Sequence, residues 1–180
     1  MLKRVRIRLR FRRHASHTHL FEDFLNGDGP FAGTALGDSL PPFAMVPEDE
    51  PEEEEEENQQ TEILCDGRLR LTPDTYSLSY EETELTGMEG SDTQVSFLRS
   101  QPGLVSMLRS GAVNTALVFE EGRRHICSYQ TPLMPFEVCV HTRTVDNRLT
   151  NDGVLRLDYF VEIRGAEAEH CRIELKVWEA

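Results

Sequence analysis

The sequence predicts an all-β protein, a single antiparallel β-barrel of eight to ten strands in meander order. Apolar and polar residues alternate with a period of two in many short runs, which is the pattern of strands with one buried face. Turn signals built from Gly, Pro, Asn and Asp separate these runs at regular intervals. At 180 residues the chain is long enough for one sizeable core, so we expect residues 1–180 to form one barrel domain.

The first predicted strand covers residues 3–13. Its apolar residues alternate with arginines in the order Arg4, Val5, Arg6, Ile7, Arg8, Leu9, Arg10, Phe11, Arg12. This alternation places the apolar set on the core and the arginines on the outer face. A row of arginines fits a nucleic-acid or anionic membrane patch, or a solvated face whose long stems cover neighbouring strands. The acidity of the whole chain favours the second interpretation.

Residues 14–60 interrupt the β pattern with thirteen acidic residues and no Lys or Arg. Within them, residues 48–57 hold nine acids in ten positions. Like charges at this density repel one another and keep a chain extended. We therefore predict an acidic, partly disordered insertion between the first and second strands. Its acids would fold back toward the arginine face, and its phenylalanines would dock on the barrel or on another subunit.

The remaining strands follow the insertion in regular order. We expect them at 61–71, 76–82, 92–99, 103–110, 113–120, 124–131 and 135–143, followed by one carrying alternate apolar residues at 155–163 and one at 171–177. Gly67 is expected to mark a bend in a long strand, and Thr72-Pro-Asp-Thr75 to form a turn. Pairing of the last strand with the first would close the barrel and remove its exposed edges.

Several short motifs in this order resemble a known family. They are Ser79-Tyr80-Glu81-Glu82, Thr86-Gly87-Met88-Glu89-Gly90, Arg109-Ser110-Gly111-Ala112-Val113-Asn114, Phe119-Glu120-x-Gly122 and Tyr129-x-Thr131-Pro132. They resemble the YwiB-like proteins, a bacterial family of unknown function. The resemblance implies a calycin-like barrel, related in shape to lipocalins, and implies no activity. After Pro132 the family tends to carry an aromatic residue and a glycine, whereas this chain has Leu133-Met134-Pro135.

Charge and hydropathy restrict the partners. The net charge of −13 argues against nucleic acid as the main partner, because phosphate binding needs a clustered positive field. No signal peptide and no apolar run of bilayer-spanning length is recognisable. We therefore expect a cytoplasmic protein with no nucleic-acid and no membrane partner.

The cysteines and histidines carry no metal-site pattern. Cys65, Cys127, Cys139 and Cys171 have no close metal-ligand spacing. They are interpreted as small buried hydrophobic residues, with Cys127 and Cys139 near each other across a hairpin that turns at Pro132. His14, His17 and His19 lie in a predicted loop without a nearby acidic or cysteine ligand, so a structural zinc is disfavoured. We expect no metal and no cofactor.

Three classes of function remain. No phosphate-binding loop or Ser–His–Asp spacing is present, so an enzyme is the least favoured. A non-catalytic barrel that binds a small polar or anionic molecule at its mouth ranks first. The alternative is a protein-interaction module or homodimer that acts through its surface and the acidic insertion.

The candidate ligand-binding residues follow from strand parity. Tyr80 and Glu82 share the face of the apolar Leu78, so both should point inward. A lone buried carboxylate is costly, and Arg109, on the same face as Met107, is the nearest complement. Tyr129 and Thr131, which share the parity of Cys127, would complete a polar ring. An equally weighted alternative is that the Arg109–Glu82 pair only plugs the barrel.

Overall fold

The protein is a closed barrel of ten antiparallel strands, which confirms the predicted fold class. The computed structural model describes residues 1–15, 58–86, 89–111, 114–130, 135–163 and 166–180, so most of the predicted insertion and Thr131 lie outside the described residues. The strands are β1 (Leu2–Ala15), β2 (Asn58–Leu71), β3 (Thr75–Glu81), β4 (Ser91–Leu98), β5 (Gln101–Gly111), β6 (Asn114–Glu120), β7 (Arg124–Gln130), β8 (Pro135–Arg148), β9 (Val154–Ile163) and β10 (Ala166–Glu179). A 3-10 turn, η1 (Glu84–Thr86), follows β3.

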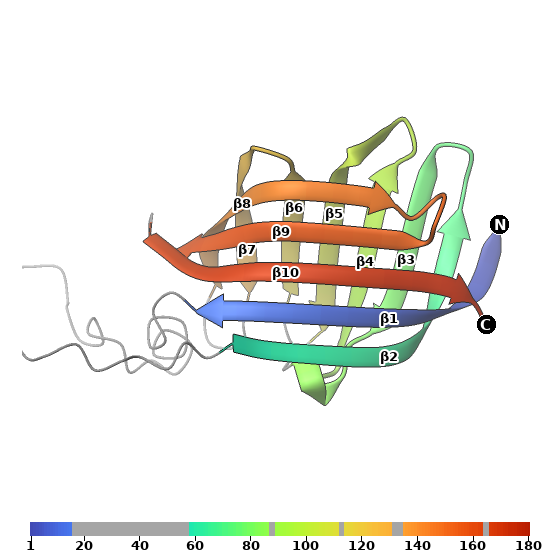
Figure 1. Ribbon diagram of the computed structural model, residues 1–180, viewed down its shortest axis with the longest axis horizontal. Helices are drawn as coiled ribbons and strands as arrows, with labels where there is room; N and C mark the ends of the chain where they lie inside the picture. The colour runs from blue at the N-terminus through green and yellow to red at the C-terminus, as the bar shows by residue number, and fades with distance from the viewer. Residues whose placement is uncertain (16–57, 87–88, 112–113, 131–134, 164–165) are drawn as a thin grey trace, which may run out of the picture.

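The order of strands around the barrel is the order of the chain, and the last strand closes on the first. β1 pairs with β10 from Val5 opposite Glu179 to Ala15 opposite Glu169. On its other side β1 pairs with β2. In Figure 1 strands β8, β9, β10, β1 and β2 run across the front, and β3 to β7 cross behind them. The predicted pairing of first and last strands is therefore confirmed.

The period-two pattern of β1 separates inside from outside as predicted. Val5, Ile7 and Leu9 are buried in the lumen, where Ile7 is 0 % exposed. The intervening arginines lie on the outer surface, and most of them are exposed. Burial of the apolar set is the main force that holds this strand in place.

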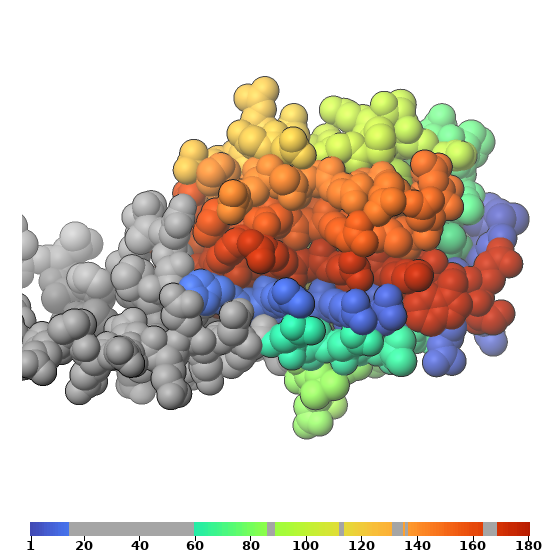
Figure 2. All heavy atoms as spheres, in the orientation of Figure 1, coloured from blue at the N-terminus to red at the C-terminus, as the bar shows by residue number. Residues whose placement is uncertain are grey.

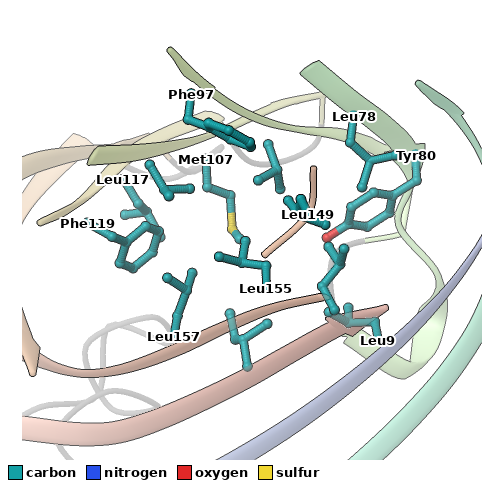
Figure 3. Close-up of a cluster of buried hydrophobic side chains, with 14 of the residues drawn as sticks. Leu9, Leu78, Tyr80, Phe97, Met107, Leu117, Phe119, Leu149, Leu155 and Leu157 are labelled. Atoms are coloured by element: carbon teal, nitrogen blue, oxygen red, sulfur yellow. The ribbon is translucent and has the colours of Figure 1, made fainter. Parts of the chain in front are cut away.

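Side chains from every strand fill the middle of the lumen (Figure 3). The ring of Phe119 meets Tyr159 edge-on, with 4.8 Å between centroids, and Tyr76 stacks on Phe97 at 5.0 Å. These are favoured aromatic geometries. The middle of the barrel is therefore a packed core, and space for a ligand has to be sought toward its ends.

Gly67, where a bend is predicted, also leaves space for a side chain of a neighbouring strand. β2 stays paired through this residue, with Val5 on one side and Tyr80 on the other. A Cβ atom at Gly67 would lie 2.3 Å from Cδ1 of Ile7 and 3.0 Å from the Ser79 carbonyl oxygen. The glycine is needed because the Ile7 side chain occupies the space that a larger residue would take.

The turn at residues 72–75 and the close approach of Gly111 to Gly90 both depend on particular residue types. The Thr72 amide donates to the Thr75 carbonyl at 3.0 Å, and the Thr75 amide donates to the Thr72 hydroxyl at 2.9 Å, which confirms the predicted turn. Gly111 has a φ of 136°, and a Cβ there would lie 2.3 Å from the Gly90 carbonyl oxygen. Only glycine combines this torsion with so close an approach.

Cys127 and Cys139 lie at adjacent register positions of the β7–β8 hairpin, near each other as predicted, but their side chains do not share a face. Cys127 lies opposite Val138, and Cys139 lies opposite Ile126, so the two thiols occupy opposite faces of the sheet. The cause is the side-chain period of two, since Val138 and Cys139 are consecutive. All four cysteines are free thiols, and Cys127 and Cys171 are buried.

The fit between Gly67 and Ile7 can be tested with a double-mutant cycle. Gly67→Ala is expected to lower the free energy of unfolding by about 1–3 kcal/mol, because the added methyl group overpacks the core. Combined with Ile7→Val, which removes the Cδ1 atom in its way, the same substitution should cost less. Urea denaturation measures both, and strictly additive effects of the two substitutions would contradict the steric explanation.

Candidate functional site

The predicted pair of Arg109 and Glu82 is present inside the barrel. Nε of Arg109 donates to Oε1 of Glu82 at 3.3 Å. The two side chains are only 12 % and 1 % exposed, respectively. The hydroxyl of Thr93 donates to the same carboxylate oxygen at 2.5 Å. The pair is therefore a buried, hydrogen-bonded ion pair and not a surface contact.

Arg109 belongs to a row of inward-facing polar residues on five consecutive strands. Residues directly opposite each other in adjacent strands share a face of the sheet. The register places the members of this row side by side, from β3 to β7, as Tyr80, Thr93, Arg109, Thr115 and Tyr129. Each member lies within three residues of the strand end that adjoins the β3–β4, β5–β6 or β7–β8 connection.

A second row of inward-facing residues lies on β8, β9, β10 and β1, and it begins on β8 six residues beyond the partner of Tyr129. Register places Thr142 of β8 beside Tyr159 of β9, Tyr159 beside Cys171 of β10, and Cys171 beside Arg13 of β1. Glu169, which is buried, accepts a hydrogen bond from the Cys171 thiol at 3.7 Å. Its carboxylate also pairs with Nε of Arg13 at 3.6 Å. Together with Glu82 and Glu169, we call these two rows the polar belt.

The two rows influence each other electrostatically across the lumen. Burial raises the pKa of Tyr159, and the positive charge of Arg109 opposes that rise. Burial likewise raises the pKa of Tyr129, against the charges of Arg109 and Arg13. Tyr80, whose ring points into the lumen in Figure 3, has its pKa raised by burial and by Glu82. All three phenols therefore stay protonated near neutral pH and act as neutral hydrogen-bond donors.

Arg109 remains a cation in spite of its burial. Desolvation lowers the pKa of its guanidinium. The negative charge of Glu82, with additional contributions from the neighbouring tyrosines, raises the pKa by more than desolvation lowers it, so the net change is upward. The polar belt thus places two arginines, two glutamates and several hydroxyl groups among the inward-facing side chains of the barrel.

Two hydroxyl groups of the polar belt have no hydrogen-bond partner among the residues that the structure describes. They are the buried Oγ1 atoms of Thr115, which lies between Arg109 and Tyr129 in the first row, and of Thr142 in the second row. Leaving a buried polar group unpaired costs about 1–3 kcal/mol, so such groups point to a bound water, ion or ligand. The other residues of the polar belt do not provide these two hydroxyls with hydrogen-bond partners.

Four of the five candidate residues chosen from the sequence come together here. Tyr80, Glu82, Arg109 and Tyr129 all belong to the polar belt, whereas Thr131 lies outside the described residues. Sequence reasoning missed the other members, namely Arg13, Thr93, Thr115, Thr142, Tyr159, Glu169 and Cys171. A usable signal existed for Thr115, which has the inward parity of Leu117 and Phe119.

Sequence reasoning also missed a pocket at the opposite end of the barrel. It has a volume of about 330 Å³ and is lined by Lys3, Leu69, Tyr76, Arg99, Leu149 and Val177, among others. Its charged groups lie at the solvent-exposed rim, where Lys3 pairs with Glu179. A wider hollow of about 630 Å³ on the outer surface, between Arg4, Asp66 and Arg68, carries both signs of charge. Neither contains a buried ion pair comparable to that of the polar belt.

The described part of the chain contains no group of three or more His, Cys, Asp or Glu side chains arranged to hold a metal ion. Within the same part of the chain no helix is long and apolar enough to cross a bilayer.

A closed ten-strand antiparallel barrel with a polar belt at one end defines the class of this protein. The chain belongs to the family described as "Domain of unknown function (DUF1934)", whose model matches residues 49–175. Its fold is similar to that of the YwiB protein from Bacillus subtilis, seen in a crystal structure, with a TM-score of 0.56 and 16 % identity over 96 % of this chain and 92 % of that one. No functionally curated protein matches the chain. The resemblance expected from the motifs is therefore confirmed, and it establishes the fold.

The buried pair predicts a strong, asymmetric response to mutation. Glu82→Leu is expected to lower the free energy of unfolding by about 3–5 kcal/mol, because it leaves Arg109 buried without its counter-charge. The double variant Glu82→Leu/Arg109→Met should recover most of that loss. The matched control is Asp66→Asn, which breaks an exposed pair with Arg6 of the same 3.3 Å length and should cost about 0–1 kcal/mol. A small effect of Glu82→Leu in urea denaturation would show that the pair is not desolvated.

Proposed function

We propose that this protein is a non-catalytic β-barrel that binds a small polar or anionic molecule at the polar belt. The observation that carries the proposal is the buried hydroxyl of Thr115 beside Arg109, which has no hydrogen-bond partner among the described residues. A ligand that accepts a hydrogen bond from this hydroxyl would satisfy it. The Arg109 guanidinium would supply charge and direction, as arginine does for carboxylates and phosphates.

The surroundings of the polar belt support binding over catalysis. Burial and the nearby Glu169 raise the pKa of the Cys171 thiol to about 12, so a reactive thiolate is disfavoured at neutral pH. The raised pKa values of Tyr80 and Tyr159 likewise oppose their use as bases. The groups of the polar belt are thus suited to hold a molecule in place rather than to attack it.

A structural plug is the competing interpretation of the Arg109–Glu82 pair. The carboxylate of Glu82 is satisfied by Arg109 and Thr93, which a plug requires. A plug would gain nothing, however, from leaving Thr115 and Thr142 unpaired, because replacing such a hydroxyl with a methyl group is neutral or stabilising. The unpaired hydroxyls therefore favour a site that is completed by a bound molecule.

Thermal unfolding with acetate, phosphate and citrate as probes tests the proposal. At constant ionic strength at least one probe is expected to raise the Tm of the wild-type protein, since a ligand that binds only the native state stabilises it, and about 1 kcal/mol shifts the Tm of a chain this long by about 2–4 °C. Thr115→Val should raise the Tm of the probe-free protein and reduce the probe-induced rise. Asp66→Asn, an exposed residue of the outer surface that is not part of the polar belt, should leave that rise unchanged. Absence of a rise with all three probes, or an undiminished rise in Thr115→Val, would contradict the proposal.

A further inference from the structure

The outer face of β1, β2 and β10 is strongly basic, although the chain as a whole is acidic. Figure 2 shows this side of the molecule, with β1 in blue, β2 in teal and β10 in red. We call it the arginine face. It is defined by the outward-facing cations Arg4, Arg6, Arg8, Arg10, Arg12, Arg68, Arg70, Arg172 and Lys176, among which lie only three acids, Glu62, Asp66 and Glu174.

Neighbouring strands neutralise only part of this charge. Arg6 pairs with Asp66 at 3.3 Å, and Arg10 pairs with Glu62 at 2.5 Å and with Glu174 at 3.6 Å. Arg172 forms an ion pair with Asp158 of β9 at 2.9 Å. The remaining cations of the face form no ion pair within the part of the chain that the structure describes: Arg4, Arg8, Arg12, Arg68, Arg70 and Lys176. Of these, Arg8 also has a buried Nε atom without a hydrogen-bond partner.

The strand register places several cations of the arginine face directly opposite one another, which is unfavourable if no anion covers the face. Arg4 lies directly opposite Arg68 on β2. Arg8 lies directly opposite Lys176 on β10, and Arg12 opposite Arg172. Like charges in directly opposed positions repel and destabilise a sheet. Three such pairs along one strand call for an anionic partner that spans them, over about 27 Å from Arg4 to Arg12 at about 3.3 Å per residue.

We propose that the arginine face is the docking surface for the chain's own acidic run, residues 48–57. This run holds nine acids in ten positions, and its last residue, Glu57, directly precedes Asn58, where β2 begins. A ten-residue segment reaches about 33–36 Å when extended, enough to follow β1 from Arg12 to Arg4. The acidic run therefore ends next to the arginine face and is long enough to extend across it.

Covalent connection favours this occupant over a separate polyanion. A segment joined to the face by a short stretch of chain is present at a high effective concentration. A nucleic acid would instead have to approach a molecule of net charge −13. Docking of the acidic run goes beyond the ligand site proposed above, because the outer face and the polar belt lie on opposite sides of the barrel wall.

Zero-length carbodiimide cross-linking tests this contact on the full chain. The reagent joins a lysine amine to a carboxylate in direct contact, and the chain has only two lysines, Lys3 and Lys176. Lys176 lies in the arginine face, whereas Lys3 is already paired with Glu179. The sequence contains no Lys or Arg between Arg13 and Arg68, so trypsin leaves the acidic run within one peptide. The expected product joins Lys176 to a residue of 48–57, identified by mass spectrometry.

Comparing the cross-link yield between two variants of equal charge, and between low and high salt, distinguishes docking from chance contact. Arg4→Gln/Arg8→Gln is expected to reduce the yield of the Lys176 cross-link several-fold. The control Arg99→Gln/Arg123→Gln removes the same charge from turns elsewhere and should leave the yield unchanged. In the wild type the yield should fall sharply in about 1 M salt, where charges are screened beyond about 3 Å.

Four outcomes would overturn the proposal. They are no link from Lys176 to residues 48–57, a yield that salt does not change, an equal loss in both variants, and links formed only between ¹⁴N- and ¹⁵N-labelled chains in a mixture. The last would show that the run of a second copy occupies the face. Salt-sensitive binding of a single-stranded DNA oligonucleotide to the wild type at sub-micromolar concentration would assign the face to nucleic acid instead.

Discussion

Closure of the barrel by β1 is the constraint on which the other features depend. β1 is hydrogen-bonded to β10 on one side and β2 on the other, so no strand of the closed sheet has a bare edge. A slip of one residue in either register would turn the arginines inward and Ile7 outward. The same register that buries the core therefore also gathers the cations into one outer face and aims Arg13 at the polar belt.

The polar belt lies where a barrel can tolerate buried charge. Its tyrosines join it to the packed core, because Tyr159 also makes the edge-on contact with Phe119. Each buried carboxylate has a guanidinium and a hydroxyl or thiol donor within reach, namely Arg109 and Thr93 for Glu82, and Arg13 and Cys171 for Glu169. Paired in this way, the charges fix the direction of neighbouring donors, which is what selective recognition of a small molecule needs.

Much of this could be predicted from the sequence, because a period of two fixes which side chains share a face. The strands, the inward direction of Arg109 and its pairing with Glu82 follow from parity within single strands. The partners on β8 to β10 could not be predicted in the same way. Their alignment with Arg109 depends on irregularities such as the register shift between Thr142 and Thr144, which no local pattern reveals. The space that Gly67 leaves for Ile7 could not be predicted for a similar reason, since Ile7 belongs to another strand.

The pairing of the first strand with the last also sets an order of events during synthesis. Val5 leaves the ribosome long before Glu179, its partner in the finished sheet. Contacts between residues so far apart in sequence are slow to form, because the whole intervening chain must first be arranged. Until β10 is made, the edge of β1 that pairs with it has unsatisfied backbone groups, although β2 is already available for the other edge, and a bare strand edge promotes aggregation. The alternate arginines of β1 then act as gatekeepers, since repulsion between them keeps two waiting chains from pairing with each other.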